Sequence, residues 1–231
     1  MKNKTAAQMK KLAAEAAVTE VESGMVVGLG TGSTVDYFLQ ALAEKTKDGL
    51  TIIGVPTSDQ TAKRAHELGI PLLENPGDVE SIDLAVDGTD EIDENGNLIK
   101  GGGGALTREK VVAFCSNRVV IVADASKIKK TLGAFPLPVE VTHFGWKAAA
   151  SHIRQLGASH VHLRIKDGSP FISDNGNLIL DADFGCIADP IGLSSELNAF
   201  PAVLENGLFC NSCSTFITAD ENGDLKWRSF S

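Results

Sequence analysis

The chain has 231 residues, of which 43 % are hydrophobic and 22 % are charged, and its formal net charge is −9. This length suits one large domain, or a large and a small one, with a buried core, and no apolar run is long enough to span a membrane. The acidic balance disfavours nucleic acid, because duplex binding depends on cationic groups that neutralise phosphates.

The first two-thirds of the chain alternates between strand and helix patterns. Residues 1–21 carry lysines among alanines. They lack the apolar run and cleavage site of a secretory signal, so we interpret them as an ordinary amphipathic helix. Short apolar runs rich in β-branched residues predict strands at 25–29, 51–55, 82–86 and 119–123. Helical patterns lie between them at 33–45, 59–68 and 107–116. This order predicts an α/β fold with a doubly wound, mostly parallel, Rossmann-like sheet.

The pattern changes after Phe135-Pro136-Leu137-Pro138. The elements expected next are a strand, a helix, two strands, a helix and a strand, at 139–142, 146–156, 161–165, 178–181, 191–199 and 202–205. This βαββαβ order is typical of a ferredoxin-like α+β domain. We therefore predict a Rossmann-like catalytic domain at 1–132 and 206–231, and a smaller ferredoxin-like domain at 133–205.

Three similar peptides, at residues 94–98, 174–178 and 221–225, each contain Asn-Gly or a close variant of it. Asn-Gly supplies the two positive φ angles of a type I′ hairpin turn. Turn chemistry explains the repetition without internal duplication, so we expect three hairpins.

Cysteine and histidine usage gives little support for a metal site. The four cysteines are few and scattered, which favours a reducing cytoplasm over a disulfide scaffold. Cys210 and Cys213 form a lone CxxC pair, for which simple packing is the preferred interpretation. His160 and His162 alternate on a predicted strand, where exposed edge positions are the commoner explanation. We expect no metal.

Ligands of open parallel sheets bind outside the carboxyl ends of the strands. The four predicted strands are followed by polar loops at residues 30–34, 57–59, 87–90 and 124–127, which suggests one shared pocket. The first loop fits neither the dinucleotide fingerprint, which needs glycine where Ser33 stands, nor a Walker loop. A glycine turn with three hydroxyls can bind a phosphate or a sugar hydroxyl, although a plain tight turn is the alternative.

Two later segments carry further candidate groups. Asp87, Asp90, Glu91 and Asp93 crowd four carboxylates into seven residues, which is costly unless cations or a function compensate, the alternative being a solvated acidic loop. The segment 100–110 contains four successive glycines, which suits a ligand that touches the backbone. Glu109 follows in the first helical turn, where the helix dipole alone could explain an acid. Together these groups suit proton transfer next to a carbonyl.

Five segments resemble the ribose-5-phosphate isomerase type A family: GLGTGSTV at 28–35, DGTDEI at 87–92, KGGGGALTREK at 100–110, ADASK at 123–127 and FPLPVEV at 135–141. The resemblance runs from about residue 10 to residue 209. It implies interconversion of ribose 5-phosphate and ribulose 5-phosphate in the non-oxidative pentose phosphate pathway, without a cofactor. It also implies a homodimer or a dimer of dimers.

The resemblance assigns roles to individual residues. Glu109 matches the catalytic base, Asp87 and Asp90 match the acidic pair beside the reacting carbons, and Lys100 matches the neighbouring cation. Asp87 is also the candidate for assisting ring opening. The residues expected to bind the sugar phosphate are Thr31, Gly32, Ser33, Thr34, Asp87, Gly88, Thr89, Asp90, Lys100, Gly101, Gly102, Gly103, Lys127 and Lys10.

The chain also departs from the family pattern. Thr89 and Gly104 stand where alanines are common, which we expect to be tolerated, and residues 210–231 are less familiar. A sugar-phosphate sensor on the same fold is the alternative function, and a deaminase or coenzyme A transferase is a further rival. The segment 100–110 favours the isomerase over all of these, since fold alone does not separate them.

Overall fold

The computed structural model describes residues 3–230, so the start and the last residue of the chain lie outside the description. The chain forms two compact units. Unit 1 contains the chain up to Thr89, Arg108–Lys127 and the segment from Ser212 onward, and unit 2 contains Asp90–Thr107 and Ile128–Asn211. The domain boundaries expected from the sequence stay a prediction, because packing units need not follow fold boundaries.

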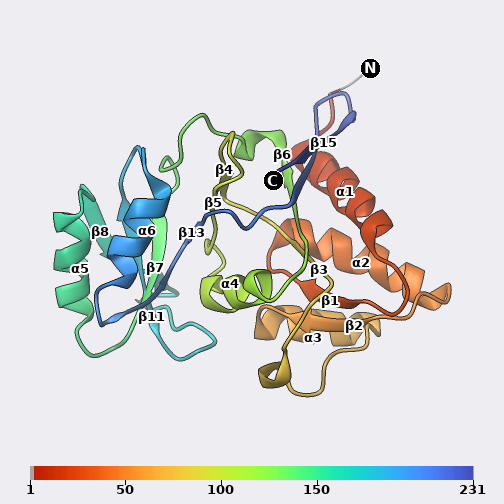
Figure 1. The fold of residues 1–231 in the computed structure, drawn as a ribbon, viewed down its shortest axis with the longest axis horizontal. Coiled ribbons are helices and arrows are strands. Elements are labelled where there is room, and N and C mark those ends of the chain that lie inside the picture. The colour runs from red at the N-terminus through yellow and green to blue at the C-terminus, as the bar shows by residue number, and fades with distance from the viewer. Residues whose placement is uncertain (1–2, 231) are drawn as a thin grey trace. The chain divides into compact units, whose positions relative to one another are not determined.

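Unit 1 is built on a six-stranded sheet with the order β15-β14-β6-β3-β1-β2 (Figure 1). Its strands are β1 (Val26–Leu29), β2 (Ile53–Pro56), β3 (Leu84–Asp87), β6 (Val119–Asp124), β14 (Thr215–Ala219) and β15 (Leu225–Ser229). All neighbours are parallel except β15, which pairs antiparallel with β14 at the edge. The four strands predicted from the sequence are confirmed, and the fold class is α/β as expected.

The helices around this sheet follow the expected periodicity. They are α1 (Ala6–Ala17), α2 (Ser33–Lys47), α3 (Asp59–Leu68) and α4 (Leu106–Phe114), with short 3₁₀ turns η1 (Val18–Glu20), η2 (Pro76–Asp78) and η3 (Ala125–Lys127). Helix α1 begins with a capping box, in which the Thr5 side chain accepts from the Gln8 N–H and the Gln8 side chain accepts from the Thr5 N–H. Among the described residues, no helix is long and apolar enough to cross a bilayer.

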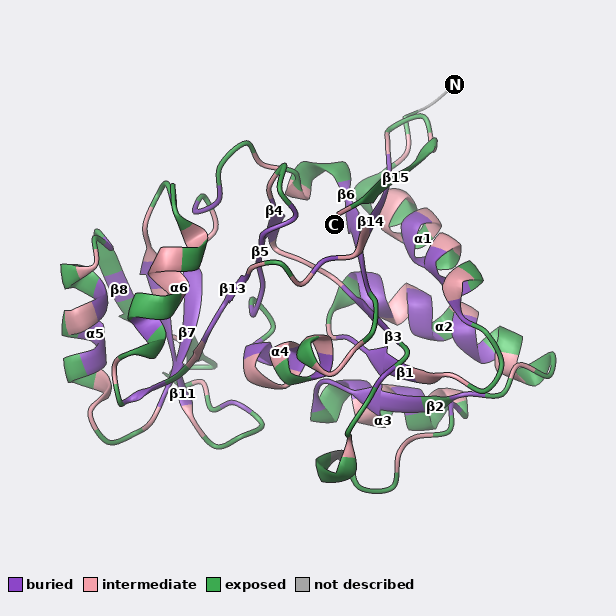
Figure 2. Cartoon of the chain, in the orientation of Figure 1, coloured by how far each residue is buried: buried purple, intermediate pink, exposed green. Residues whose placement is uncertain are grey.

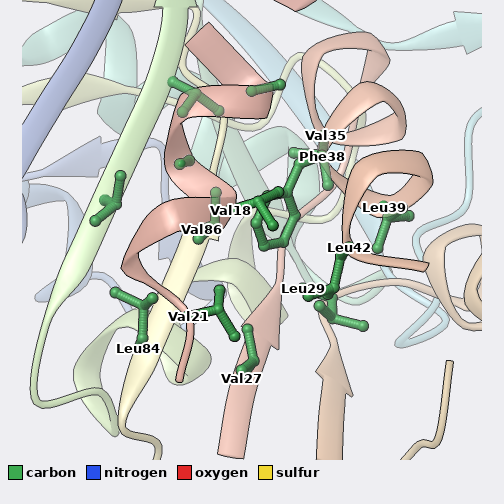
Figure 3. Close-up of a cluster of buried hydrophobic side chains, with 14 of the residues drawn as sticks. Val18, Val21, Val27, Leu29, Val35, Phe38, Leu39, Leu42, Leu84 and Val86 are labelled. Carbon is green, nitrogen blue, oxygen red and sulfur yellow. The ribbon is translucent and has the colours of Figure 1, made fainter. Parts of the chain in front are cut away.

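The core of unit 1 lies where α2 packs on the sheet. Figure 3 shows Phe38 and Leu42 of α2 beside Leu29 of β1, and all three side chains are fully buried. Full burial of such a side chain stabilises the fold by about 1.5–3 kcal/mol. Figure 2 shows the central strands buried while the outer faces of the helices stay exposed, as the period of 3.6 residues predicts. The parallel pairing of β1 with β2 and β3 fixes the register of the strand ends above this core.

Unit 2 contains an antiparallel sheet with the order β12-β7-β11-β8. Its elements are β7 (Leu137–Val141), α5 (Trp146–Gln155), β8 (His160–Leu163), β11 (Leu178–Asp183), α6 (Pro190–Asn198) and β12 (Val203–Asn206). The strands of the βαββαβ unit thus take the spatial order fourth, first, third, second, which is the ferredoxin-like arrangement. His160 and His162 are exposed on the edge strand β8, as expected.

Short strands complete unit 2. A three-stranded sheet joins β13 (Leu208–Phe209), β5 (Leu98–Ile99) and β4 (Glu91–Ile92), and a two-stranded ribbon joins β9 (Ile165–Lys166) to β10 (Ser169–Pro170). The sequence did not predict these pairs, because two residues are too few to show a hydrophobic period. They matter for the site, since β4 lies within the acidic segment 87–93 and β5 ends just before the glycine run 101–104.

The prediction of type I′ turns is wrong. The three turn glycines have positive φ angles of 80°, 78° and 91°: Gly96, Gly176 and Gly223. The preceding asparagines do not, because the only non-glycine residues with positive φ angles in the described chain are Asp167 and Asn211.

A side-chain acceptor explains these turns instead. The Asp220 carboxylate accepts from the N–H groups of Asn222 and Asp224, and the Asp220 carbonyl accepts from the Gly223 N–H. Asp93 and Ser173 make the equivalent contacts in the other two turns. In the third turn, the hydrogen bonds to the Asp220 carboxylate, chiefly the one from the Asp224 N–H, hold the pKa of Asp220 below its usual value. The polar residue before the repeat therefore fixes each turn.

Candidate active site

In unit 1 the candidate residues lie at the carboxyl ends of parallel strands. Strand β1 ends at Leu29 and leads through Gly30 to α2, β3 ends at Asp87, and β6 ends at Asp124. Because these strands are parallel and adjacent through β3, their ends share one edge of the sheet. This is the edge at which the sequence predicts ligand binding.

Asp87 is held rigidly beside the glycine turn. Its side chain is 5 % exposed, and its Oδ1 accepts from the N–H of Thr31 at 3.1 Å and of Gly88 at 2.7 Å. Gly30 provides the space, since a Cβ atom there would stand 2.1 Å from Asp87 Oδ1. The position of the Asp87 carboxylate therefore depends on a glycine at position 30. The carboxylate is already oriented before any ligand binds.

The Thr31 hydroxyl belongs to a cluster that sequence reasoning missed. Its Oγ1 lies 2.8 Å from Thr57 Oγ1, 2.8 Å from Ser58 Oγ and 3.2 Å from Thr61 Oγ1. Thr61 Oγ1 also donates to the Gly30 carbonyl at 2.8 Å. Thr57 and Ser58 stood out in the sequence only as a polar loop. Their pairing with Thr31 depends on the parallel register of β1 and β2.

Two lysines were expected at the edge of the site. Lys10 Nζ lies 3.3 Å from Ser33 Oγ and 4.0 Å from Asp124 Oδ2, so the structure brings this lysine to the start of α2. Asp124 is 3 % exposed and also accepts from Ser126, which makes it a buried counter-ion absent from the predicted set. Lys127 is half-buried in η3, three residues beyond Asp124.

A cavity of about 450 Å³ opens beside the loop between β1 and α2. It is lined by Gly32 and Ser33 together with residues of α2 and α3. Arg64 lines it but donates to Asp36 at 2.6 Å, which keeps the pKa of its guanidinium above the usual value. Asp36 thus compensates the Arg64 charge.

Glu109 lies in the first turn of α4 and is 5 % exposed. If the helix dipole were the only reason for an acid at this position, the carboxylate would be expected at the surface, because burial costs a charged group its solvation. Its neighbour Arg108 is half-buried and pairs with Asp59 at 2.7 Å. The burial of Glu109 favours a chemical role over the dipole explanation.

Unit 2 supplies the other charged candidates. Asp90 Oδ2 accepts from the Gly102 N–H at 2.8 Å, and the Asp90 N–H donates to the Ile99 carbonyl at 2.8 Å. Lys100 is 3 % exposed, and its ammonium lies 5.5 Å from the centre of the Phe209 ring. A charge this far removed from water interacts strongly with an opposite charge nearby.

Internal packing explains three of the four successive glycines. Gly101 and Gly104 have positive φ angles of 96° and 87°, and a Cβ atom on Gly102 would stand 2.8 Å from Asp90. The N–H of Gly104 donates to the Gly101 carbonyl at 2.9 Å, which closes the turn. Ligand contact with the run stays a prediction, supported by the exposure of Gly102 and Gly103.

Arg164 clamps this turn and was not predicted. Its Nη1 donates to the carbonyls of Gly101 at 2.9 Å and Gly102 at 3.2 Å. Its Nε and Nη2 donate to the Asp181 carboxylate at 2.9 and 2.5 Å. No sequence signal marks Arg164, because it lies in an irregular link between β8 and β9. The clamp fixes the carbonyl directions of the glycine run.

No group of three or more His, Cys, Asp or Glu side chains within residues 3–230 is arranged to hold a metal ion. The four cysteines are free thiols. Cys213 is buried, and its burial raises the pKa of the thiol to about 12.

Comparison with known proteins decides the family. The model of the ribose 5-phosphate isomerase A (phosphoriboisomerase A) family matches residues 53–223, which is more than half of the chain. The chain belongs to this family. Ribose-5-phosphate isomerase A of Parvibaculum lavamentivorans is 50 % identical over 220 residues, which cover 93 % of this chain and 95 % of that protein.

Solved structures of isomerases from this family have the same fold. A D-ribose-5-phosphate isomerase in complex with phospho-erythronic acid has a TM-score of 0.93 and 41 % identity, covering 98 % of this chain and 100 % of that chain. Ribose 5-phosphate isomerase A from Neisseria gonorrhoeae has a TM-score of 0.91 and 33 % identity, with 99 % of both chains covered. The resemblance noted in the sequence is thereby confirmed.

Proposed function

We propose that this chain is an aldose–ketose isomerase that interconverts D-ribose 5-phosphate and D-ribulose 5-phosphate through an enediolate. The observation that carries the proposal is the buried carboxylate of Glu109, on a segment whose family is established. The pathway served would be the non-oxidative pentose phosphate pathway, as the family implies.

Glu109 is the proposed base. In the open-chain aldose, the aldehyde at carbon 1 acidifies the proton on carbon 2. The Glu109 carboxylate removes this proton, the electron pair moves to the carbonyl oxygen, and an enediolate forms. The resulting carboxylic acid then returns the proton to carbon 1, which gives the ketose. A single carboxylate can make both transfers, because both carbons present their hydrogen on the same face of a planar enediolate.

Lys100 is proposed to stabilise the negative enediolate oxygen. The residue is 3 % exposed, and charge stabilisation is stronger where water is excluded. Asp90 is fixed by the Gly102 N–H and is proposed to move the proton between the two substrate oxygens.

Asp87 is proposed to assist opening of the furanose ring. Its buried carboxylate keeps one oxygen oriented by two N–H donors. The test compares Asp87→Asn on the cyclic substrate and on an analogue that cannot cyclise. A loss confined to the cyclic substrate is expected, whereas equal losses on both would remove this role.

The phosphate and hydroxyls of the sugar are assigned to the β1–α2 loop and the two lysines. The residues proposed are Thr31, Gly32, Ser33, Thr34, Gly88, Thr89, Lys10 and Lys127, with Gly101, Gly102 and Gly103 of the glycine run. A related isomerase has been solved in complex with phospho-erythronic acid. That compound joins a phosphate to a planar carboxylate, so it shares the charge and planarity of the enediolate. This supports an anion-stabilising site in the family.

The decisive variant is Glu109→Gln, which keeps shape and removes the base. Turnover is expected to fall by about a hundredfold to ten-thousandfold. The matched control, Glu74→Gln, changes an exposed glutamate and should keep wild-type turnover. Near-normal turnover of Glu109→Gln would end the assignment. Binding of ribose 5-phosphate by the wild type without turnover would instead favour the sugar-phosphate sensor.

We further propose a cytoplasmic location and a homodimer or dimer of dimers. The location rests on the few, scattered cysteines, and the oligomeric state rests on the family. Light scattering during size-exclusion chromatography tests the second, because a monomeric mass at micromolar concentration would contradict it.

A further inference from the structure

Glu140 is a buried acid that the proposed chemistry does not use. It lies on β7, is 0 % exposed, and is flanked along that strand by buried residues. A carboxylate at such a position is costly unless donors surround it, and an apolar side chain would be the simpler choice. Its presence calls for a specific partner.

Four side chains donate to this carboxylate. Thr107 Oγ1 lies 2.5 Å from Glu140 Oε2, and Ser173 Oγ lies 2.7 Å from Oε1. The Nδ2 groups of Asn177 and Asn175 lie 3.1 and 3.3 Å from Oε1. Oε1 thus receives the donors of the 173–177 turn, while Oε2 accepts from Thr107.

Thr107 is the second residue of α4 and stands two residues before Glu109. The residue before it, Leu106, is fully buried, and its Cβ would lie 2.9 Å from a Cβ on Gly101. The first turn of α4 is therefore held by the buried Leu106 side chain and by a hydrogen bond to a buried charge, and Arg108 in the same turn pairs with Asp59. The Thr107 hydrogen bond is one of the contacts that fix the rotation of that turn, and this rotation sets the direction of the Glu109 side chain.

We propose that Glu140 is a positioning residue that acts through Thr107 to orient the base Glu109. The proposal rests on the proposed role of Glu109. Proton abstraction needs the carboxylate within hydrogen-bond reach of carbon 2, and a displacement of about 1 Å can cost about a hundredfold in rate. Loss of the Thr107 contact should therefore lower kcat, while KM stays nearly unchanged.

The test compares three variants of the full chain. Thr107→Val removes the hydroxyl but keeps the shape, Thr107→Ser restores the donor, and Ser173→Ala removes a donor to the same carboxylate away from α4. We expect Thr107→Val to lower kcat by about tenfold to a hundredfold with KM within about threefold. Thr107→Ser and Ser173→Ala should keep kcat within about threefold of the wild type. A Tm measured for each variant reports stability separately.

Two outcomes would overturn the proposal. One is a wild-type kcat for Thr107→Val, and the other is an equal fall in kcat for Thr107→Val and Ser173→Ala, which would point to general loosening. Should Thr107→Val fail to fold, Glu140→Gln tests the same bond with less change in shape, and a wild-type kcat for that variant would also overturn it. Glu109→Gln is assayed in parallel. If only the Glu140 proposal fails, Glu109→Gln is still inactive. If the assignment of Glu109 as the base fails, Glu109→Gln is active.

Discussion

The Asp87 carboxylate occupies the space that a side chain on Gly30 would need. A Cβ on Gly30 would stand 2.1 Å from Asp87 Oδ1 and 2.7 Å from the Asp87 Cα, so neither a side-chain rotation nor a small shift can relieve the contact. The close approach of β1 to the acidic residue at the end of β3 therefore depends on glycine.

Gly30→Ala is expected to lower the free energy of unfolding by about 1–3 kcal/mol, because overpacking displaces Asp87. It should also lower turnover. Gly88→Ala is the matched control, since its Cβ would have no neighbour closer than 3.9 Å and should leave thermal unfolding almost unchanged. Equal unfolding temperatures for the two variants, measured by calorimetry, would contradict this account.

The Arg164 clamp predicts a coupled effect on stability and turnover. Arg164→Lys keeps the charge but loses the planar fork that reaches both Asp181 and the glycine carbonyls. We expect a loss of about 1–3 kcal/mol in unfolding free energy and a fall in turnover of about tenfold or more.

A double-mutant cycle with Asp181→Asn checks the pairing. Residues in one network show coupling energies of about 0.5–3 kcal/mol. Additive effects of the two substitutions would show that the two side chains act independently, against the clamp.

Replacing Gly104 by alanine is expected to lower the stability of the chain by an amount that depends on Phe171. Its backbone has a φ of +87°, and a Cβ there would lie 2.4 Å from the Phe171 ring. Gly104→Ala should therefore destabilise the chain by about 1–3 kcal/mol, as left-handed backbone and ring contact both oppose a side chain. In a Phe171→Ala background the cost should shrink, because only the backbone term remains. If urea unfolding gives the same loss of unfolding free energy for Gly104→Ala in both backgrounds, the Phe171 ring moves aside without cost, which would contradict the prediction.

Cys213 predicts unequal thiol reactivity. Burial raises the pKa of its thiol from 9.0 to about 12, so at pH 8 only about one thiol in ten thousand would be ionised. Iodoacetamide should therefore modify the exposed Cys186 long before Cys213 in the folded protein. Peptide mass spectrometry gives the order of modification, and Cys213 reacting as fast as Cys186 would refute the burial.

The same shift has a consequence for stability. Between pH 9 and about 12 the unfolded thiol has lost its proton while the folded thiol keeps it, so the contribution of this group is full below pH 9 and falls as the pH rises. Alkaline unfolding of Cys213→Ala should therefore show a weaker pH dependence in this range.

The long elements of the fold were predictable from hydrophobic period. The predicted helix at 59–68 coincides with α3, and the four predicted parallel strands each overlap the observed ones. The two-residue strands were not predictable, because their pairing is set by the tertiary fold. The turn type failed because a local side chain, Asp93 in the first turn, outweighs the preference of Asn-Gly.

The candidate site was predictable where backbone position decides it. Asp87 and the β1–α2 loop follow strand ends, so the rule for parallel sheets locates them. Arg164 and Glu140 were missed, because each acts through partners far away in the sequence, and Asp124 was expected only as part of a polar loop. Their signals are burial and hydrogen bonds, which exist only in the folded chain.

The most direct test follows carbon-bound deuterium. EDTA-treated protein is incubated with ribose 5-phosphate in heavy water, and ketose formation and exchange are followed by NMR for the wild type and for Glu109→Gln. The wild type is expected to form ribulose 5-phosphate with solvent deuterium at carbon 1, and Glu109→Gln is expected to lose isomerisation and exchange together. Exchange at the wild-type rate in Glu109→Gln would contradict the assignment of Glu109 as the base.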